Sequence, residues 1–145
     1  MPKKEMDTTM TYAQPMVQSS PQKSSLDMGA LVECIRACTD CAQACTACAD
    51  ACLGERDVQM LVRCIRLDLN CADICAATGA VMSRQAAFEP ALLRPLLQAC
   101  VQACRLCGDE CELHGQQGME HCRICAEACR RCEQACNAVL SALQA

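Results

Sequence analysis

The sequence predicts an all-α protein, an antiparallel up-down-up-down four-helix bundle with a cysteine-lined core. Three observations indicate this fold. Cysteines recur at alternating steps of three and four residues, which is the spacing of the inward-facing positions of bundle helices. The four segments that carry them are rich in Ala, Leu, Gln, Arg and Glu and lack the β-branched alternation of strands. The connections between them are short, which makes consecutive helices antiparallel neighbours.

Residues 1–25 precede the predicted bundle, which we expect to occupy residues 26–145. Two lysines near the start are followed by Thr, Gln, Ser and Pro rather than by the apolar stretch of a secretory signal peptide. We therefore expect a flexible N-terminal tail. The thioethers of Met6, Met10 and Met16 could capture a soft metal ion, but a disordered tail is the simpler interpretation.

The first helix is expected over residues 26–53, with Ser24 and Asp27 spaced as a capping box and Gly54 as its C-terminal stop. Steps of four and three separate its six cysteines, so they lie on one face. They are Cys34, Cys38, Cys41, Cys45, Cys48 and Cys52.

The second helix is expected to run from Asp57, which can cap it, to about Ala87. It has fewer cysteines than the other helices, namely Cys64, Cys71 and Cys75. Continuing its cysteine spacing places Asp68 in a core position. This carboxylate either serves as a metal ligand or partner of a ligand, or drifts outward to reach a surface arginine.

The third helix is expected at residues 90–114, because Pro90 suits a first helical turn, and the fourth at residues 118–143. Their cysteines follow the spacing of the first helix. The third helix carries Cys100, Cys104, Cys107 and Cys111. The fourth carries Cys122, Cys125, Cys129, Cys132 and Cys136.

The cysteine content itself restricts the function, since 18 of 145 residues exceed the roughly 8–10% at which cysteine defines a protein class. Packing as small hydrophobes explains one or two thiols, and the ferredoxin run C-x2-C-x2-C-x3-C-P is absent. Disulfides within a helix are excluded, because Cβ atoms at i and i+4 lie about 5–6 Å apart and a disulfide needs about 3.5–4.5 Å. Disulfides between helices remain open. A cytoplasmic chain with reduced, metal-binding thiols is favoured.

Charge and geometry favour Cu(I) over zinc. Two metal–sulfur bonds of about 2.3 Å span roughly 4.5 Å, so two inward-leaning thiols at i and i+4 can close around one ion. Zinc would leave uncompensated negative charge on each four-thiolate site, whereas one Cu(I) per thiolate leaves the core neutral. We expect storage and buffering of many Cu(I) ions per chain, roughly one per cysteine.

A thiolate zinc buffer or a thiol redox protein is the alternative function. An enzyme is not expected, because no cysteine is singled out beside a base that would lower its pKa. The formal net charge of −4 offers no basic surface for nucleic acid or anionic lipid, and no apolar stretch suits a membrane span. Neither nucleic acid nor a membrane is an expected partner.

The segments CIRACTDCAQACTACADAC, CVQACRLCGDEC and CRICAEACRRCEQAC resemble the four-helix-bundle copper storage proteins. The resemblance covers residues 31–140 and, without a signal peptide, points to the cytosolic branch. It implies a homo-tetramer of bundles that fill with Cu(I) and release it to a small thiol or a copper-accepting chaperone. Asp68 in a cysteine position and the long Met-containing tail depart from the family pattern.

The two ends of the bundle differ when each cysteine stripe is continued. One end is closed by hydrocarbon from Leu31, Met82, Leu93, Leu97, Val139 and Leu143. At the other end lie the exchangeable soft or borderline ligands His114, His121, Met60 and Met119, so we expect copper to enter there. His114 could instead interact with the helix dipole, His121 could be a solvated first-turn residue, and Met60 could serve only in packing.

Overall fold

The computed structural model describes residues 11–144, and helices account for all of the regular structure in this range. The helices are α1 (Ala13–Ser19), α2 (Met28–Leu53), the 3₁₀ helix η1 (Val58–Leu61), α3 (Val62–Met82), α4 (Pro90–Gln116) and α5 (Glu120–Gln144). None of the described helices is both long and apolar enough to cross a membrane.

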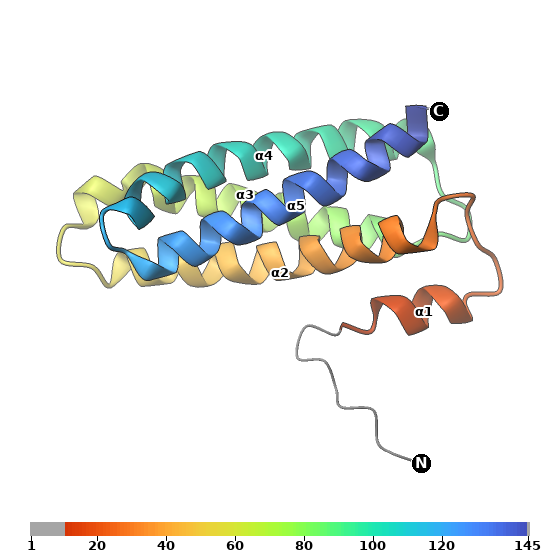
Figure 1. Cartoon of the computed structure of the whole chain (residues 1–145), viewed down its shortest axis with the longest axis horizontal. Coiled ribbons are helices and arrows are strands. Elements are labelled where there is room, and N and C mark those ends of the chain that lie inside the picture. Colours follow the sequence, from red (N-terminus) through yellow and green to blue (C-terminus); the bar gives the residue numbers. More distant parts are fainter. Residues whose placement is uncertain (1–10, 145) are drawn as a thin grey trace, which may run out of the picture.

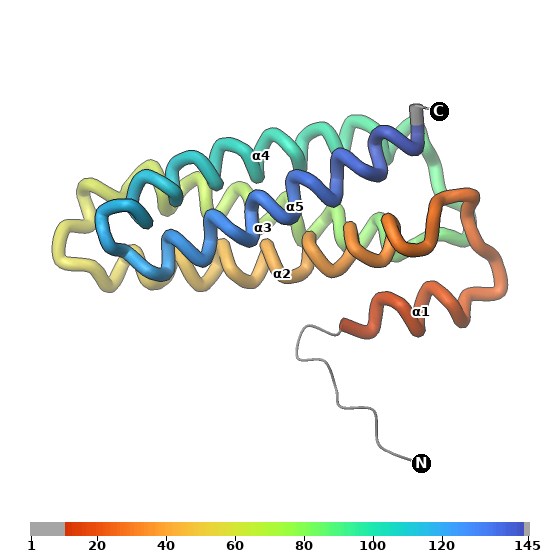
Figure 2. The backbone as a smooth tube through the Cα atoms, viewed as in Figure 1, coloured from red at the N-terminus to blue at the C-terminus, as the bar shows by residue number. Residues whose placement is uncertain are grey.

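The four long helices form an elongated antiparallel bundle (Figures 1 and 2). Each helix contacts the one before and the one after it, and α5 returns to contact α2, so the four helices enclose one central core. The α2–α3 and α4–α5 connections meet at one end, which lies on the left of Figure 1. The predicted all-α, up-down-up-down four-helix bundle is confirmed.

The helix boundaries refine the sequence prediction. Asp27 is the N-cap of α2, because its carboxylate accepts a hydrogen bond from the backbone N–H of Ala30 at 2.9 Å. The expected capping box led by Ser24 is therefore wrong, since its hydroxyl accepts from the N–H of Leu26 instead. Gly54 ends α2 as expected.

The second bundle helix is shorter than predicted. Asp57 precedes the 3₁₀ helix η1 and makes no side-chain capping bond, and α3 proper begins at Val62. At the other end α3 stops at Met82, five residues before the expected Ala87. Pro90 occupies the first turn of α4 as predicted.

The segment before α2 differs from the expected tail. Within residues 1–25, α1 forms a helix that packs against α2 and buries Ala13 and Val17. Met16 is 67% exposed on this helix, while Met6 and Met10 lie outside the described residues. The prediction of a flexible tail therefore does not describe residues 13–19.

Hydrocarbon closes the end of the core opposite the α2–α3 connection. Five of the six side chains predicted there are buried and Leu143 is partly buried. The buried five are Leu31, Met82, Leu93, Leu97 and Val139. Between this plug and the other end, the interior is filled by thiols.

Candidate metal centre

All 18 cysteines are free and buried, and none is more than 1% exposed. Side chains three and four residues apart lie on the same face of a helix, so the cysteine steps direct every thiol into the space enclosed by α2–α5. The bulkier Leu and Ile residues that usually fill such positions are confined mainly to the plug and the helix flanks. The core is therefore a continuous column of sulfur.

Neighbouring sulfur atoms in this column lie 3.6–3.9 Å apart, both along one helix and between helices. For example, Cys45 Sγ is 3.8 Å from Cys41 on the same helix and 3.6 Å from Cys125 on α5. Both values far exceed the roughly 2.05 Å of a disulfide bond. The spacing matches two metal–sulfur bonds of about 2.3 Å that meet at one ion.

Four-thiol groups recur along the column, and in each the sulfur atoms lie within 4.8 Å of one another. Several sulfurs belong to two groups at once: Cys41, Cys45, Cys129 and Cys132. Another group, near the α2–α3 connection, consists of Cys48, Cys52, Cys64 and Cys122. Because the groups share members, metal ions bound in them would be bridged by common thiolates rather than isolated.

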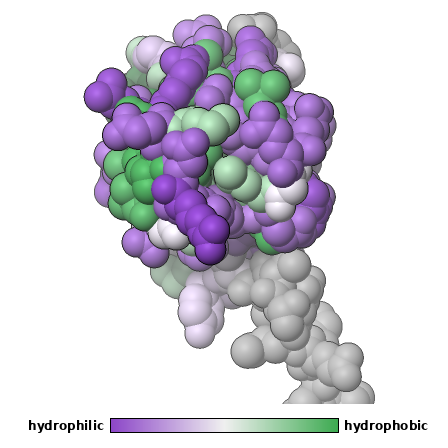
Figure 3. Space-filling view, turned by 90° about the vertical axis from the view of Figure 1, so that its left-hand side faces the viewer, coloured by the Kyte–Doolittle hydropathy of each residue, from purple (hydrophilic) through white to green (hydrophobic). Residues whose placement is uncertain are grey.

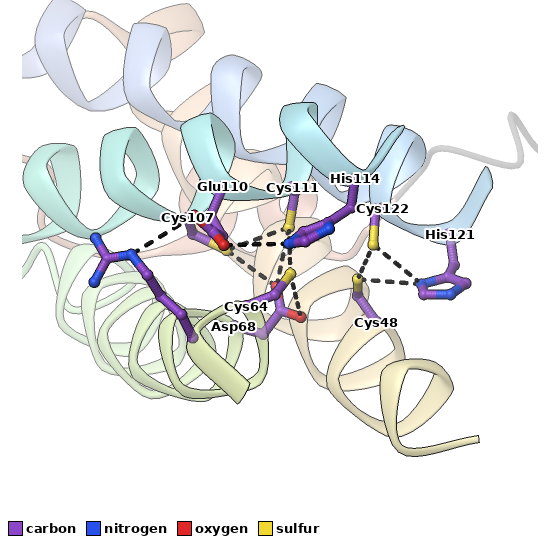
Figure 4. A network of polar contacts seen from close by, with 10 residues as sticks. Cys48, Cys64, Asp68, Cys107, Glu110, Cys111, His114, His121 and Cys122 are labelled. Carbon is purple, nitrogen blue, oxygen red and sulfur yellow. Dashed lines mark hydrogen bonds and ion pairs between the residues drawn. The ribbon is translucent and has the colours of Figure 1, made fainter. Parts of the chain in front are cut away.

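Asp68 lies inside the sulfur column with none of its surface exposed. Its Oδ1 atom accepts hydrogen bonds from the thiols of Cys107 at 3.1 Å and of Cys111 and Cys125 at 3.3 Å each. Cys64, one turn earlier on α3, is 3.9 Å from Oδ2 (Figure 4). The alternative of a surface arginine partner is wrong, since all these partners are thiols.

Burial raises the pKa of the Asp68 carboxyl to about 7. Burial likewise raises the pKa of the Cys52 thiol to about 12. Without metal, the Cys52 thiol therefore stays neutral at neutral pH, and the Asp68 carboxyl keeps its proton up to about pH 7. Metal binding to such a site must displace protons.

His121 lies at the end of the column where α2–α3 and α4–α5 connect. Its Nδ1 atom is 3.4 Å from Cys48 Sγ and 3.5 Å from Cys122 Sγ (Figure 4). Its Nε2 atom lies 3.1 Å from Glu55 Oε1. The side chain is 26% exposed, so the ring reaches solvent on one side and the thiol core on the other. His121 lies in the first turn of α5, but its contacts with two thiols contradict the alternative of a merely solvated residue.

His114 is arranged differently. It is only 7% exposed, and its Nε2 atom lies 3.2 Å from Glu110 Oε1, one turn earlier on α4. Its buried Nδ1 atom has no hydrogen-bond partner among the described residues. The structure thus brings His121, but not His114, within hydrogen-bond distance of thiols.

The two predicted methionines at this end also differ from each other. Met119 is partly buried against the core, whereas Met60 is 61% exposed. Viewed from this end, the surface is largely hydrophilic with small apolar patches (Figure 3). Met119 is therefore the better placed of the two thioethers to meet an ion on its way to the thiols.

Two residues of this end were absent from the sequence prediction. Glu55 and Glu110 each pair with one of the histidines. Glu110 could have been found from its i,i+4 spacing to His114 on one helix. Glu55 lies in the connection after α2, 66 residues from His121, and no spacing rule points to it.

Comparison with known proteins gives consistent matches. A family model described as copper storage protein matches residues 27–141. The copper storage protein Ccsp from Streptomyces lividans, solved with 10 copper equivalents, is 49% identical with a TM-score of 0.86, covering 89% of this chain and 98% of that one.

Two further solved structures of Streptomyces lividans proteins match over most of their length. A Ccsp variant with one histidine replaced by alanine is 53% identical with a TM-score of 0.80, covering 83% of this chain and 99% of that one. A cytosolic copper storage protein with five coppers is 55% identical with a TM-score of 0.75, covering 78% of this chain and 93% of that one. None of the curated proteins compared with the chain matches it.

Proposed function

The chain belongs to the copper storage protein family, and from this premise we propose that it stores and buffers many Cu(I) ions in its thiol core. The single observation that carries this function is the column of 18 buried free thiols with shared four-sulfur groups. A storage site needs high capacity and exchangeable ligands, and thiolates that bridge neighbouring ions supply both.

The balance of charge favours Cu(I) as the stored ion. Eighteen ionised thiols would place 18 negative charges in a space from which water is excluded. One Cu(I) per thiolate cancels this charge, and each sulfur that belongs to two groups can bridge two ions. Isolated tetrahedral zinc sites would use up the thiols in sets of four and keep a negative charge on each set.

We assign metal binding to all 18 cysteines and to residues beside them at the polar end. His121 contributes Nδ1, and Asp68 contributes a carboxylate oxygen once its thiol partners are ionised. Met119 and the free Nδ1 of His114 lie near the route that an entering ion takes. Met60 fits this role less well because of its exposure.

The same thiol chemistry indicates the cellular compartment and the partners of the protein. Free thiols persist in a reducing compartment, and the Streptomyces lividans relative is described as cytosolic, so we place this chain in the cytoplasm. We propose a homo-tetramer that exchanges copper with a small thiol or a copper-accepting chaperone. The family is one of storage proteins, and we assign the chain no enzymatic role.

Anaerobic titration with a competing chelator tests the storage function. The reduced chain should take up Cu(I) well beyond four or five equivalents and should hold it against a competing Cu(I) chelator. The same titration with Zn(II) should saturate at about one ion per four thiols and be reversed when Cu(I) is added. Saturation by both metals at four or five equivalents would support the zinc-buffer alternative.

A further inference from the structure

The carboxylate of Glu55 determines which nitrogen of His121 faces the thiols. An ionised carboxylate can only accept hydrogen bonds, so its partner nitrogen Nε2 must carry the proton. In neutral imidazole the other nitrogen, Nδ1, then has a free lone pair. That lone pair points to Cys48 and Cys122, which lie 3.4 and 3.5 Å away.

These three atoms form a nearly regular triangle. The sulfurs of Cys48 and Cys122 are 3.8 Å apart, and each lies 3.4–3.5 Å from Nδ1 of His121. The point equidistant from the three atoms is about 2.1 Å from each, close to ordinary metal–nitrogen bonds of about 2.0–2.1 Å and metal–sulfur bonds of about 2.3 Å. One nitrogen and two sulfurs are therefore already spaced for a three-coordinate ion, a geometry suited to Cu(I).

We propose that Glu55 is a positioning residue for the entry of copper: its hydrogen bond holds His121 with Nδ1 directed at Cys48 and Cys122, and so preforms a three-coordinate site at the polar end of the bundle. This inference rests on the proposed copper storage function. It adds to that function a residue outside the four long helices whose carboxylate acts through His121.

Exposure explains why an orienting partner is needed at this position. The side chains of His121 and Glu55 are 26% and 39% exposed, so packing alone restrains the ring weakly. A ring turned by 180° about its Cβ–Cγ bond would present carbon instead of Nδ1 to the thiols. The bond to Glu55 favours one orientation, as carboxylates do for metal-binding histidines, where their loss typically lowers metal affinity about 10–100-fold.

The other histidine supplies a natural contrast. Glu110 pairs with His114 through the same ring atom, Nε2, yet no thiol lies within hydrogen-bond distance of His114 Nδ1 in the described structure. A carboxylate partner alone therefore does not make a metal site. The site at His121 combines the partner with two thiols, contributed by α2 and α5.

The test replaces Glu55 and follows His121 by nitrogen NMR of histidine-labelled protein. Gln in Glu55→Gln keeps an oxygen that can accept from Nε2–H, whereas Met in Glu55→Met has similar length and no strong acceptor. Glu127→Met is the matched control, because Glu127 is an exposed glutamate whose ion pair within residues 11–144 is with Arg123. The metal-free spectrum should show hydrogen-bonded Nε2–H in wild type, Glu55→Gln and Glu127→Met, and its loss in Glu55→Met.

Chelator-buffered Cu(I) then titrates the Nδ1 resonance of His121. Half-saturation should require about 10–100-fold more free Cu(I) in Glu55→Met than in wild type, with Glu55→Gln and Glu127→Met within a few-fold of wild type. Total copper uptake and the free energy of unfolding should be unchanged in all variants. Thus a simply misfolded variant would be recognised.

Three results would overturn the inference. The first is an unchanged His121 spectrum and half-saturation in Glu55→Met. The second is an equal loss in Glu55→Gln, which would show that charge matters and the hydrogen bond does not. The third is a wild-type His121 resonance that never moves while the chain fills with copper. Failure of the proposed function itself would look different, because the wild-type chain would then bind no more than four or five equivalents of Cu(I).

Discussion

Replacing Asp68 with asparagine should remove a pH dependence of stability from the metal-free protein. Asparagine has nearly the same shape and can accept the same thiol hydrogen bonds through its oxygen, but it cannot ionise. Asp68 is fully buried among thiols, and its pKa is raised from an ordinary value of 3.8 to about 7. The unfolded chain should return this carboxyl to its ordinary pKa.

The sign of the effect follows from proton binding. Between pH 4 and pH 7 the folded protein keeps the Asp68 proton while the unfolded chain loses it, so raising the pH favours unfolding. Raising this pKa from 3.8 to about 7 lowers the free energy of unfolding by about 4 kcal/mol in total as the pH rises, and about 3 kcal/mol of this falls between pH 5 and pH 8. The stabilising contribution is complete below pH 4 and lost as pH rises through 7.

Urea unfolding followed by circular dichroism measures this difference in reduced, metal-free protein at pH 5, 6.5 and 8. The stability of Asp68→Asn relative to wild type should increase by about 3 kcal/mol across this range. The control Asp73→Asn changes an exposed aspartate on the same helix and should run parallel to wild type. Parallel curves for Asp68→Asn and wild type would refute the raised pKa of Asp68.

Three further outcomes are expected. The reduced chain without metal should give a helical far-ultraviolet dichroism spectrum, because neutral thiols and the plug can pack without metal, and Cu(I) should raise the melting temperature without adding helix; a disordered spectrum would contradict this. In stopped-flow loading, His121→Phe should slow Cu(I) uptake more than His114→Phe, because only His121 contacts thiols, and the final copper count should be nearly unchanged. Comparable slowing by Leu97→Phe would show that copper enters through the plugged end instead. Leu93→Ala should lower the free energy of unfolding of the metal-free bundle by about 2–5 kcal/mol in urea, because Leu93 is 1% exposed in the plug. The number of copper ions bound should not change, because the leucine side chain offers no metal ligand.

The sequence predicted the bundle because one period runs through all four helices. Cysteine at steps of three and four identifies the inward face of each helix without any other information. The same period placed Asp68 in the core, where the structure has it among thiols. Continuing the stripes also identified the plug, because helix geometry extends unchanged beyond the last cysteine.

What the sequence did not predict depends on contacts between distant segments. The helix α1 has seven residues, too few to be stable alone, and it exists through the packing of Ala13 and Val17 against α2. Residues 58–61 form a 3₁₀ turn where the helical pattern predicts an α-helix. Glu55 meets His121 only because two connections converge at one end of the bundle. Periodicity shows which face of a helix is buried, but it does not show which distant segments contact one another.

The number of Cu(I) ions bound per chain distinguishes a bridged column of thiolates from separate four-thiolate sites. Native mass spectrometry under anaerobic conditions counts them on the fully reduced protein after excess Cu(I) has been removed. Bridged binding along the whole sulfur column predicts about one ion per thiolate, close to 18 per chain. A population that stops at about four or five ions would mean separate four-thiolate sites and would contradict a Cu(I) storage core.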